Sequence, residues 1–238
     1  GNNIPANYFI GGSTGPNSAG LLFDGIGSYG PGTATYHWDG TNWTAGGALP
    51  AIGPGGNSYT SGAGTQTAGL CIGGIGDPPP ARVTRVLDYD GSAWTSGNST
   101  PLTTAGTAAD GPNAAAWIAG GDGGPGMSGK SFTYDSSSWT ASGDLNAACP
   151  QGVQGNGWGS TTDAIMAGGA SPTTSSQTYD GTSWASGASM STARAQSSMC
   201  SAMTGSSNGF VAGASPPIHD ETEEYQAAGP ATVSITSS

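Results

Sequence analysis

The chain has 238 residues, of which 8% are charged and 8% are aromatic, and its formal net charge is −11 at pH 7. Four Lys and Arg residues against fifteen Asp and Glu residues argue against nucleic-acid binding, because phosphate contacts need a basic face. No stretch approaches the roughly 20 apolar residues of a membrane-spanning helix, so membrane insertion is not expected. Seven Trp and eight Tyr residues argue for a folded chain despite 44 Gly and 16 Pro residues.

A six-residue phrase recurs along the chain. It reads WDGTNW at 38–43, YDGSAW at 89–94, YDSSSW at 134–139 and YDGTSW at 179–184. An apolar marker precedes each copy: LLFDG at 21–25, LCIGG at 70–74, WIAGG at 117–121 and IMAGG at 165–169. A weaker fifth marker, FVAGA at 210–214, is followed by Tyr225. The spacing predicts five units of roughly 48 residues that fill the chain.

Each unit divides into four short β segments. In the second unit these segments are 57–64, 67–73, 83–89 and 93–96, and Gly, Pro, Asn and Ser bound them. Asp-Gly between two aromatic-flanked strands predicts a hairpin turn, since Gly accepts positive φ without steric cost. The segment 231–237 is expected to form the last outer strand. The pattern predicts an all-β fold.

A strand that ends in Gly-Gly, a variable loop, an aromatic-Asp pair and a downstream Trp together resemble the kelch repeat. The resemblance covers all five units and implies a five-bladed kelch-like β-propeller with four antiparallel strands per blade. It implies a single domain, 1–238, with blades at about 1–50, 51–101, 102–145, 146–189 and 190–238. Two features depart from the family: the aromatic-to-Trp step is short, and the Arg that often follows the fourth strand occurs only at Arg194. These Gly- and Ser-rich, Lys-poor units are also similar to repeat arrays in structural and tail-fibre proteins of tailed phages from aquatic hosts.

The repeated Trp and Asp residues have structural interpretations. An identical position in every unit favours packing between blades over ligand stacking for Trp43, Trp94, Trp139 and Trp184. Turn formation, in which the side chain bonds its own backbone, is favoured over calcium binding for Asp39, Asp90, Asp135 and Asp180. A calcium loop needs several oxygen ligands close together, whereas these four lie in separate units.

No catalytic or metal-binding constellation is found, so no catalytic residue, metal or cofactor is expected. The only histidines are His37 and His219, and the three cysteines show no metal-ligand spacing. We interpret Cys71, Cys149 and Cys200 as small buried hydrophobic residues, with a disulfide between two of them as the alternative. The Gly-rich stretch 120–130 lacks the spacing of a phosphate-binding loop. The two-Tyr, two-His set of kelch-fold copper-radical oxidases cannot be assembled.

The longer loops point to one face of the predicted propeller. Loops between strands two and three lie on one face with the links between blades, while the Asp-Gly hairpins lie on the other. Variable loops on a rigid scaffold commonly carry recognition, and Arg and Tyr are enriched at interface hot spots. The residues predicted to contact a partner there are Tyr29, Arg82, Lys130, Arg194 and His219.

The sequence thus favours a non-enzymatic structural or adhesion module of a virion or an extracellular surface, such as a phage fibre, appendage or capsid decoration. Few Lys and Arg residues deny trypsin-like proteases their cleavage sites, which suits an exposed setting. The expected partners are other particle or surface proteins and a host surface glycan, and a homo-oligomer is compatible with this role. The alternatives are a polysaccharide-acting enzyme on a propeller scaffold and a cellular kelch-type interaction scaffold, because a fold alone does not choose among them.

Overall fold

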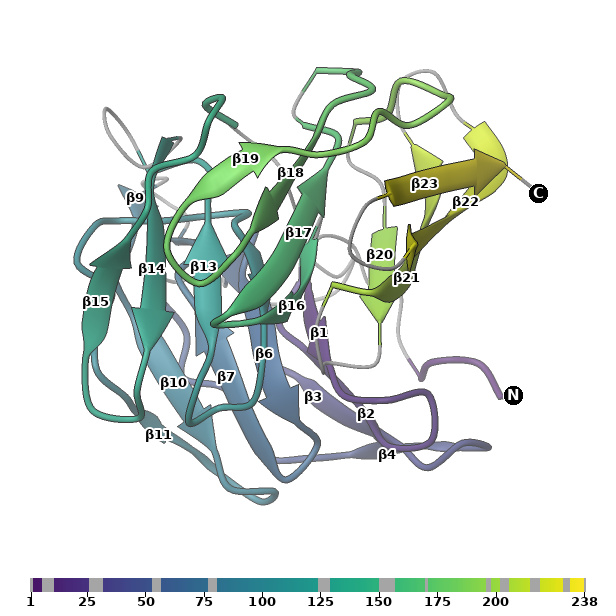
Figure 1. Cartoon of the computed structure of the whole chain (residues 1–238). Coiled ribbons are helices and arrows are strands. Elements are labelled where there is room, and N and C mark those ends of the chain that lie inside the picture. Colours follow the sequence, from purple (N-terminus) through teal and green to yellow (C-terminus); the bar gives the residue numbers. More distant parts are fainter. Residues whose placement is uncertain are drawn as a thin grey trace.

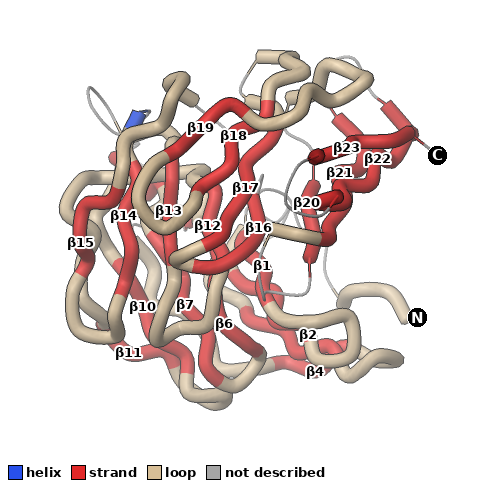
Figure 2. Tube along the Cα trace, viewed as in Figure 1, coloured by secondary structure: helices blue, strands red, loops and turns tan. Residues whose placement is uncertain are grey.

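The computed structural model describes residues 2–5, 11–25, 32–52, 57–76, 81–123, 129–149, 157–169, 171–195, 198–201, 206–214, 219–228 and 232–237. Within these ranges the regular structure is β-strand, apart from one helical turn at Gly129 (Figure 1, Figure 2). The predicted all-β fold is confirmed. In the same ranges, no helix is long and apolar enough to cross a membrane.

Six antiparallel sheets are formed by the described residues, and five of them have four strands. The first sheet contains β1 (Gly12–Thr14), β2 (Gly20–Phe23), β3 (Thr35–Trp38) and β4 (Trp43–Ala45). The second contains β6 (Ser61–Thr65), β7 (Ala68–Ile72), β10 (Val86–Tyr89) and β11 (Trp94–Ser96). The third contains β12 (Ala108–Asp110), β13 (Trp117–Ala119), β14 (Ser131–Tyr134) and β15 (Trp139–Ser142).

The remaining sheets complete the chain. The fourth contains β16 (Gly157–Ser160), β17 (Asp163–Ala167), β18 (Ser176–Tyr179) and β19 (Trp184–Ser186). The fifth contains β20 (Ser198–Ser201), β21 (Asn208–Ala214), β22 (His219–Ala228) and β23 (Thr232–Ser237). A three-stranded sheet that the sequence did not predict joins β5 (Asn57–Ser58), β8 (Ile75–Gly76) and β9 (Ala81–Arg82).

Each four-stranded sheet is built from one continuous stretch of chain, and its strands lie in sequence order from first to fourth. The first strands of successive sheets contact one another, β1 with β6, β6 with β12, β12 with β16 and β16 with β20. The sheets therefore stand side by side with their first strands inward, which is a propeller-like arrangement (Figure 1). That they are the blades of a closed five-membered ring stays a prediction.

The hydrophobic core lies at the junctions between neighbouring sheets. Between the first and second sheets, Phe23 and Leu21 pack with Leu87 and Trp94. Between the second and third sheets, Ile72 packs with Ile118 and Phe132 in a separate cluster, and a third cluster fills the junction between the third and fourth sheets. The second and third sheets thus bury both of their faces against neighbouring sheets.

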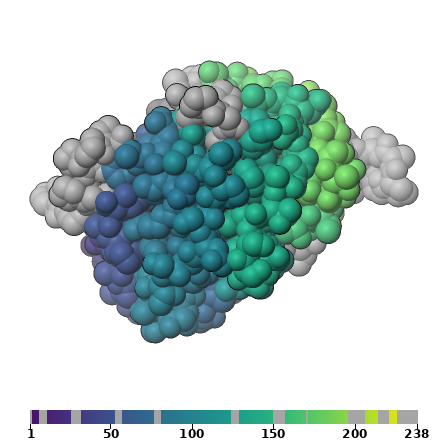
Figure 3. Space-filling model, turned by 90° about the vertical axis from the view of Figure 1, so that its left-hand side faces the viewer, coloured from purple at the N-terminus to yellow at the C-terminus, as the bar shows by residue number. Residues whose placement is uncertain are grey.

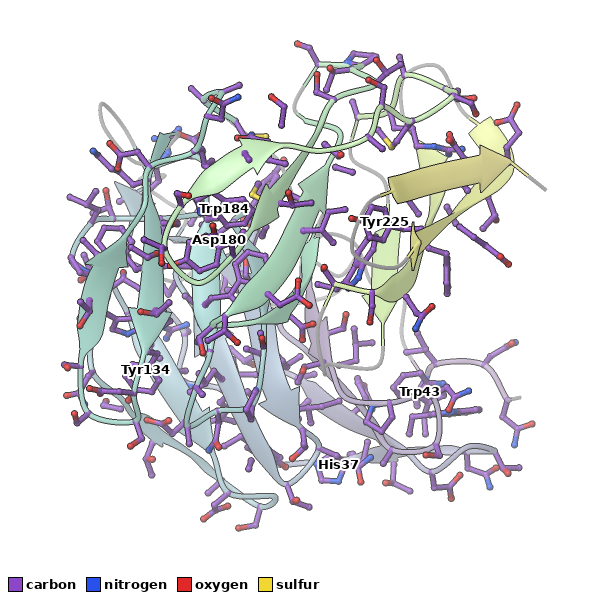
Figure 4. All side chains as sticks on the ribbon, in the orientation of Figure 1. His37, Trp43, Tyr134, Asp180, Trp184 and Tyr225 are labelled. Atoms are coloured by element: carbon purple, nitrogen blue, oxygen red, sulfur yellow. The ribbon has the colours of Figure 1, made fainter. Side chains whose placement is uncertain are left out.

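The closing tryptophans of three sheets join each sheet to the one before it. The Trp94 indole Nε1–H donates to the Thr35 hydroxyl oxygen at 2.9 Å, and the Trp184 indole donates to the Ser131 hydroxyl oxygen at 3.0 Å. Trp139 donates to the Asn98 carbonyl oxygen at 2.9 Å. Packing between sheets is therefore confirmed for these three residues. The side chain of Trp43, labelled in Figure 4, instead has its ring contact with Trp38 of its own sheet.

The repeated aspartates form the outer hairpin turns, as predicted. In each turn one carboxylate oxygen accepts hydrogen bonds of 2.7–2.9 Å from the backbone amides two and three residues later, and the four residues are Asp39, Asp90, Asp135 and Asp180. These bonds lower the pKa of all four carboxyl groups, to about 2 for Asp135, where the Ser137 hydroxyl contributes most. The aspartates are therefore turn formers, each with one carboxylate oxygen bonded to the backbone of its own turn.

Replacing Ser136 with Gly is expected to stabilise the protein by about 0.5–1 kcal/mol. The residue after the turn aspartate has positive φ in every one of these hairpins: 93° at Gly40, 94° at Gly91, 90° at Gly181 and 73° at Ser136. Only Ser136 carries a Cβ in this left-handed region, where L-residues are strained. Thermal and urea unfolding measure the gain.

Ser137→Gly is the matched control in the same turn. Ser137 has no positive φ, and its hydroxyl donates to the Asp135 carboxylate at 2.7 Å. This variant is expected to lose stability, since Gly loses more backbone freedom on folding and the hydroxyl bond disappears. Equal effects of the two substitutions would contradict the strain at Ser136.

Candidate partner-binding face

Because the strands alternate in direction within each sheet, the described parts of the loops between second and third strands and of the links between sheets lie on one side of the molecule, here called the loop face. Two of the predicted contact residues are exposed there and ion-paired. The Arg82 guanidinium, in β9, pairs with the Asp122 carboxylate of the third unit, and their side chains are 38% and 21% exposed. The Lys130 ammonium lies 2.7 Å from the Asp144 carboxylate, and both side chains are well exposed. Both cations thus reach the surface with their charge already matched.

Arg194 does not meet the expectation of a surface contact. Its side chain has no exposed area, and its Nε and Nη2 each donate to the Glu223 carboxylate at 3.2 Å. Its Nη1 donates to the carbonyl oxygens of Gly213 and Glu221 at 2.7 and 3.1 Å. The prediction that Arg194 contacts a partner is therefore wrong, because every part of its guanidinium is used inside the protein.

The other two predicted contacts are not placed by the structure. Tyr29 lies outside the described residues. His219 begins β22, where its backbone pairs with Ala214, but its side chain is outside the described part. The structure therefore brings only Arg82 and Lys130 to the loop face as described side chains.

A cleft of about 240 Å³ opens on the loop face between the third and fourth sheets. Its walls come from the link between these sheets, from the end of β17 and from the loop before β18, and they include Ala148, Cys149, Met166, Gly169, Thr173 and Ser175. The Gln177 side chain holds the link in place, since its Oε1 accepts from the Ala147 amide at 3.0 Å and its Nε2 donates to the Ala147 carbonyl at 2.9 Å. Hydroxyl groups and small apolar side chains therefore share this cleft.

The described cysteines are structural. Cys71 and Cys149 are buried and free of disulfides, which confirms their interpretation as small buried residues. Burial raises the pKa of the Cys149 thiol to about 11, so the thiol stays protonated at neutral pH. Nothing is described of the Cys200 side chain.

A buried polar cluster that the sequence did not reveal lies between the first and second sheets. Asp24, at the end of β2, is fully buried and has φ of 63°, and its Oδ1 accepts from the Gly25 amide at 2.8 Å. Among the described residues, its Oδ2 has no hydrogen-bond partner, and neither do the buried Nε and Nη2 of Arg85. Burial raises the pKa of Asp24 to about 6, although the Gly25 amide, the Thr60 hydroxyl and the Arg85 charge act in the opposite direction.

The sequence did contain a signal for this cluster. The second-strand markers of the other units place Gly where the first unit has Asp24, and these glycines share its left-handed backbone: φ is 65° at Gly73, 62° at Gly120, 75° at Gly168 and 64° at Gly213. An Asp at a Gly position is a departure that the five-fold comparison makes visible. Grouping LLFDG with the other four markers as one apolar pattern hides this difference.

Metal binding finds no support in the described ranges, where no three His, Cys, Asp or Glu side chains gather closely enough to hold an ion. No protein-family model matches the sequence, and no curated protein sequence matches it either. Among solved structures the protein is similar to that of YjhT, with 15% sequence identity, a TM-score of 0.58, and 98% of each chain covered. YjhT is propeller-like. At this identity the likeness concerns the fold alone, and it supports a propeller-like all-β architecture across the chain.

Proposed function

We propose that the protein is a non-enzymatic surface module of a virion or extracellular structure, folded as a five-bladed kelch-like β-propeller. Its loop face attaches to a particle protein, to another surface protein or to a host surface glycan. The observation that carries the proposal is the loop face itself, where exposed ion pairs and a cleft of about 240 Å³ stand on loops anchored by four-stranded sheets. Such loops on a rigid scaffold commonly carry recognition.

The amino-acid composition supports a location outside the cell. The chain has only four Lys and Arg residues, so trypsin-like proteases find few cleavage sites, which suits a protein exposed outside the cell. On a molecule with a net charge of −11, Arg82 and Lys130 place two cationic side chains on the loop face, each beside a carboxylate. Local charge of this kind affects the orientation and the association rate of a partner more than its final affinity.

Replacing Arg82 and Lys130 together with Ser tests the loop face. Both ion pairs are exposed, and exposed pairs contribute about 0–1 kcal/mol to stability, so the melting temperature is expected to stay nearly unchanged. Attachment to host cells, or assembly onto the particle from which the protein is purified, is expected to weaken. Surface plasmon resonance on immobilised cell envelopes and particles measures the change.

Asp39→Ser, on the opposite hairpin face, is the control and should leave attachment unaltered. Full attachment by the Arg82 and Lys130 double variant would move the contact to the hairpin face or to the outer edges of the sheets. Turnover of a polysaccharide by the purified protein would instead reject the non-enzymatic role.

A further inference from the structure

A polar pocket of about 310 Å³ lies away from the loop face, between the second and third sheets. These two sheets are the blue and teal regions that lie side by side in Figure 3. The pocket is lined by Asp88 of β10, by Asn98 after β11, by Tyr134 of β14, and by Asn113 and Ser136 from two turns on the hairpin face. Most of its lining is polar, and the pocket opens to the surface rather than forming part of the core.

Comparison with the equivalent junctions explains why a pocket opens here. Four residues after the closing Trp, the first and third sheets have Gly47 and Gly143. Each packs so tightly on the hairpin of the next sheet, at Ser92 and Thr182 respectively, that a Cβ would overlap a carbonyl oxygen there. The second sheet has Asn98 at this position. A side chain of that size cannot occupy the closed geometry, and the third sheet's hairpin leaves space beside it.

A second difference between the units, Val86 in place of a hydroxyl residue, also keeps the second and third sheets from closing together. Thr35 and Ser131 supply the hydroxyl oxygens that accept the indole N–H of the next sheet's Trp. The equivalent residue of the second sheet is Val86, which has no acceptor, and Trp139 donates to the Asn98 backbone instead. Trp139 accordingly remains only partly buried, whereas Trp94 and Trp184 are 8% and 7% exposed.

The carboxylate in this pocket is not used by the protein. At the equivalent position of the first sheet, His37 Nε2 lies 2.7 Å from the Tyr89 hydroxyl, so the two side chains satisfy each other. In the second junction Tyr134 takes the place of Tyr89, but its hydroxyl donates to the Ser136 carbonyl at 3.1 Å. The Asp88 carboxylate has no hydrogen-bond partner among the described residues, and partial burial raises its pKa. A ligand hydroxyl that donates a hydrogen bond can take the place of water beside such a carboxylate.

The lining combines a carboxylate acceptor, two primary amides that both donate and accept, and a serine hydroxyl. Closely spaced groups of this kind match the hydroxyls of a sugar ring, each of which donates and accepts. The volume is at the lower end of the range for small-ligand pockets, which suits one ring rather than an extended chain. Asp88 and the net charge of −11 disfavour an anionic sugar.

From this geometry we infer that the junction between the second and third sheets is a binding site for a single neutral or amino hexose residue. The strain at Ser136 fits the inference, because strained backbone that a repeat does not need is commonly kept at binding sites. The inference does not depend on the loop face. It adds a saccharide site to the protein whichever surface carries attachment.

The test exchanges the pocket residues for those of the closed junctions. Asp88→Thr copies Thr133 and Thr178, and Asn98→Gly copies Gly47 and Gly143, so the double variant D88T/N98G uses residues that the same repeat already accommodates. Methyl glycosides of glucose, galactose, mannose and N-acetylglucosamine, together with glucosamine and glucuronate, are titrated into the ¹⁵N-labelled full chain. At least one neutral or amino sugar is expected to bind saturably with a Kd of about 1 mM.

Binding should shift the indole N–H signal of Trp139 and leave those of Trp94 and Trp184 unchanged. D88T/N98G should weaken binding at least about tenfold, a difference of about 1.4 kcal/mol, and glucuronate should not bind. Thr178→Ala with Ala188→Gly alters the same two repeat positions of the fourth sheet and should bind like the parent. The Arg82 and Lys130 double variant should also bind normally, which separates this site from the proposed function.

Three results would overturn the inference. The first is that no sugar of the panel gives a saturable shift at Trp139. The second is full affinity in a folded D88T/N98G variant, which would place the site elsewhere. The third is stronger binding of glucuronate than of glucose, which is incompatible with a carboxylate in the pocket.

Discussion

Arg194→Met is expected to lower the free energy of unfolding by about 3–5 kcal/mol, because it leaves the Glu223 carboxylate buried without its counter-charge. The pair is enclosed completely, with both side chains at 0% exposure. The Glu223 carboxylate also accepts from the amides of Ser191 and Thr192 at 2.7 and 3.1 Å, so one ion pair joins the fourth-to-fifth link to β22. Urea unfolding followed by tryptophan fluorescence measures the loss.

Lys130→Met is the matched control, since it removes one partner of an exposed ion pair and should cost about 0–1 kcal/mol. The pH dependence gives a second check. Burial raises the pKa of Glu223, but the Ser191 and Thr192 amides and Arg194 outweigh burial and hold it below its usual value. The stabilisation is therefore present at neutral pH and is lost as the pH falls through that lowered pKa. Similar losses of unfolding free energy in Arg194→Met and Lys130→Met would show that the buried pair contributes no more than an exposed one.

Asp24→Asn is expected to stabilise the protein by about 2–3 kcal/mol at pH 7.5 and by almost nothing at pH 3.5. The pKa of the Asp24 carboxyl is about 6 in the folded protein, compared with 3.8 for an unburied Asp carboxyl. Between these values the unfolded chain releases a proton that the folded chain keeps, so the parent loses stability as the pH rises from about 4 to 6. Asn also tolerates the left-handed backbone at this position.

The measurement is the difference in unfolding free energy between variant and parent across this pH range, which cancels the titration of all other groups. Asp39→Asn is the control with the opposite sign, because hydrogen bonds from the Asn42 and Thr41 amides lower the pKa of Asp39. The Asp39→Asn variant should become less stable than the parent as the pH rises through that lowered pKa. A flat difference for Asp24→Asn would mean that the Arg85 charge fully compensates the buried carboxylate.

Local chemistry made much of the fold predictable. Asp90 and Gly91 mark a turn through hydrogen bonds and backbone freedom that act within four residues, so the sequence alone locates the hairpin. The repeat then places four strands around each such turn. In the second unit the predicted segments 57–64, 67–73, 83–89 and 93–96 contain β6, β7, β10 and β11 in large part.

Features that depend on contacts between residues distant in sequence are not predictable in the same way. The position of Arg194 in a link between sheets predicts exposure, but its partner Glu223 lies 29 residues later, in β22, and buries it. The pocket depends on Asn98 and Val86 differing from their equivalents in neighbouring units. Averaging the repeat to find the fold conceals such differences, whereas comparing the units position by position reveals them.

The construction of each four-stranded sheet from one continuous stretch of chain has a kinetic consequence. Strand pairing joins only segments that are close in sequence, such as β16 with β17 and β17 with β18, so loop closure costs little entropy at each step. Local pairing of this kind favours fast formation of each sheet, in contrast to sandwiches whose neighbouring strands come from distant parts of the chain. We expect each sheet to form soon after it leaves the ribosome and to serve as the template against which the next one packs.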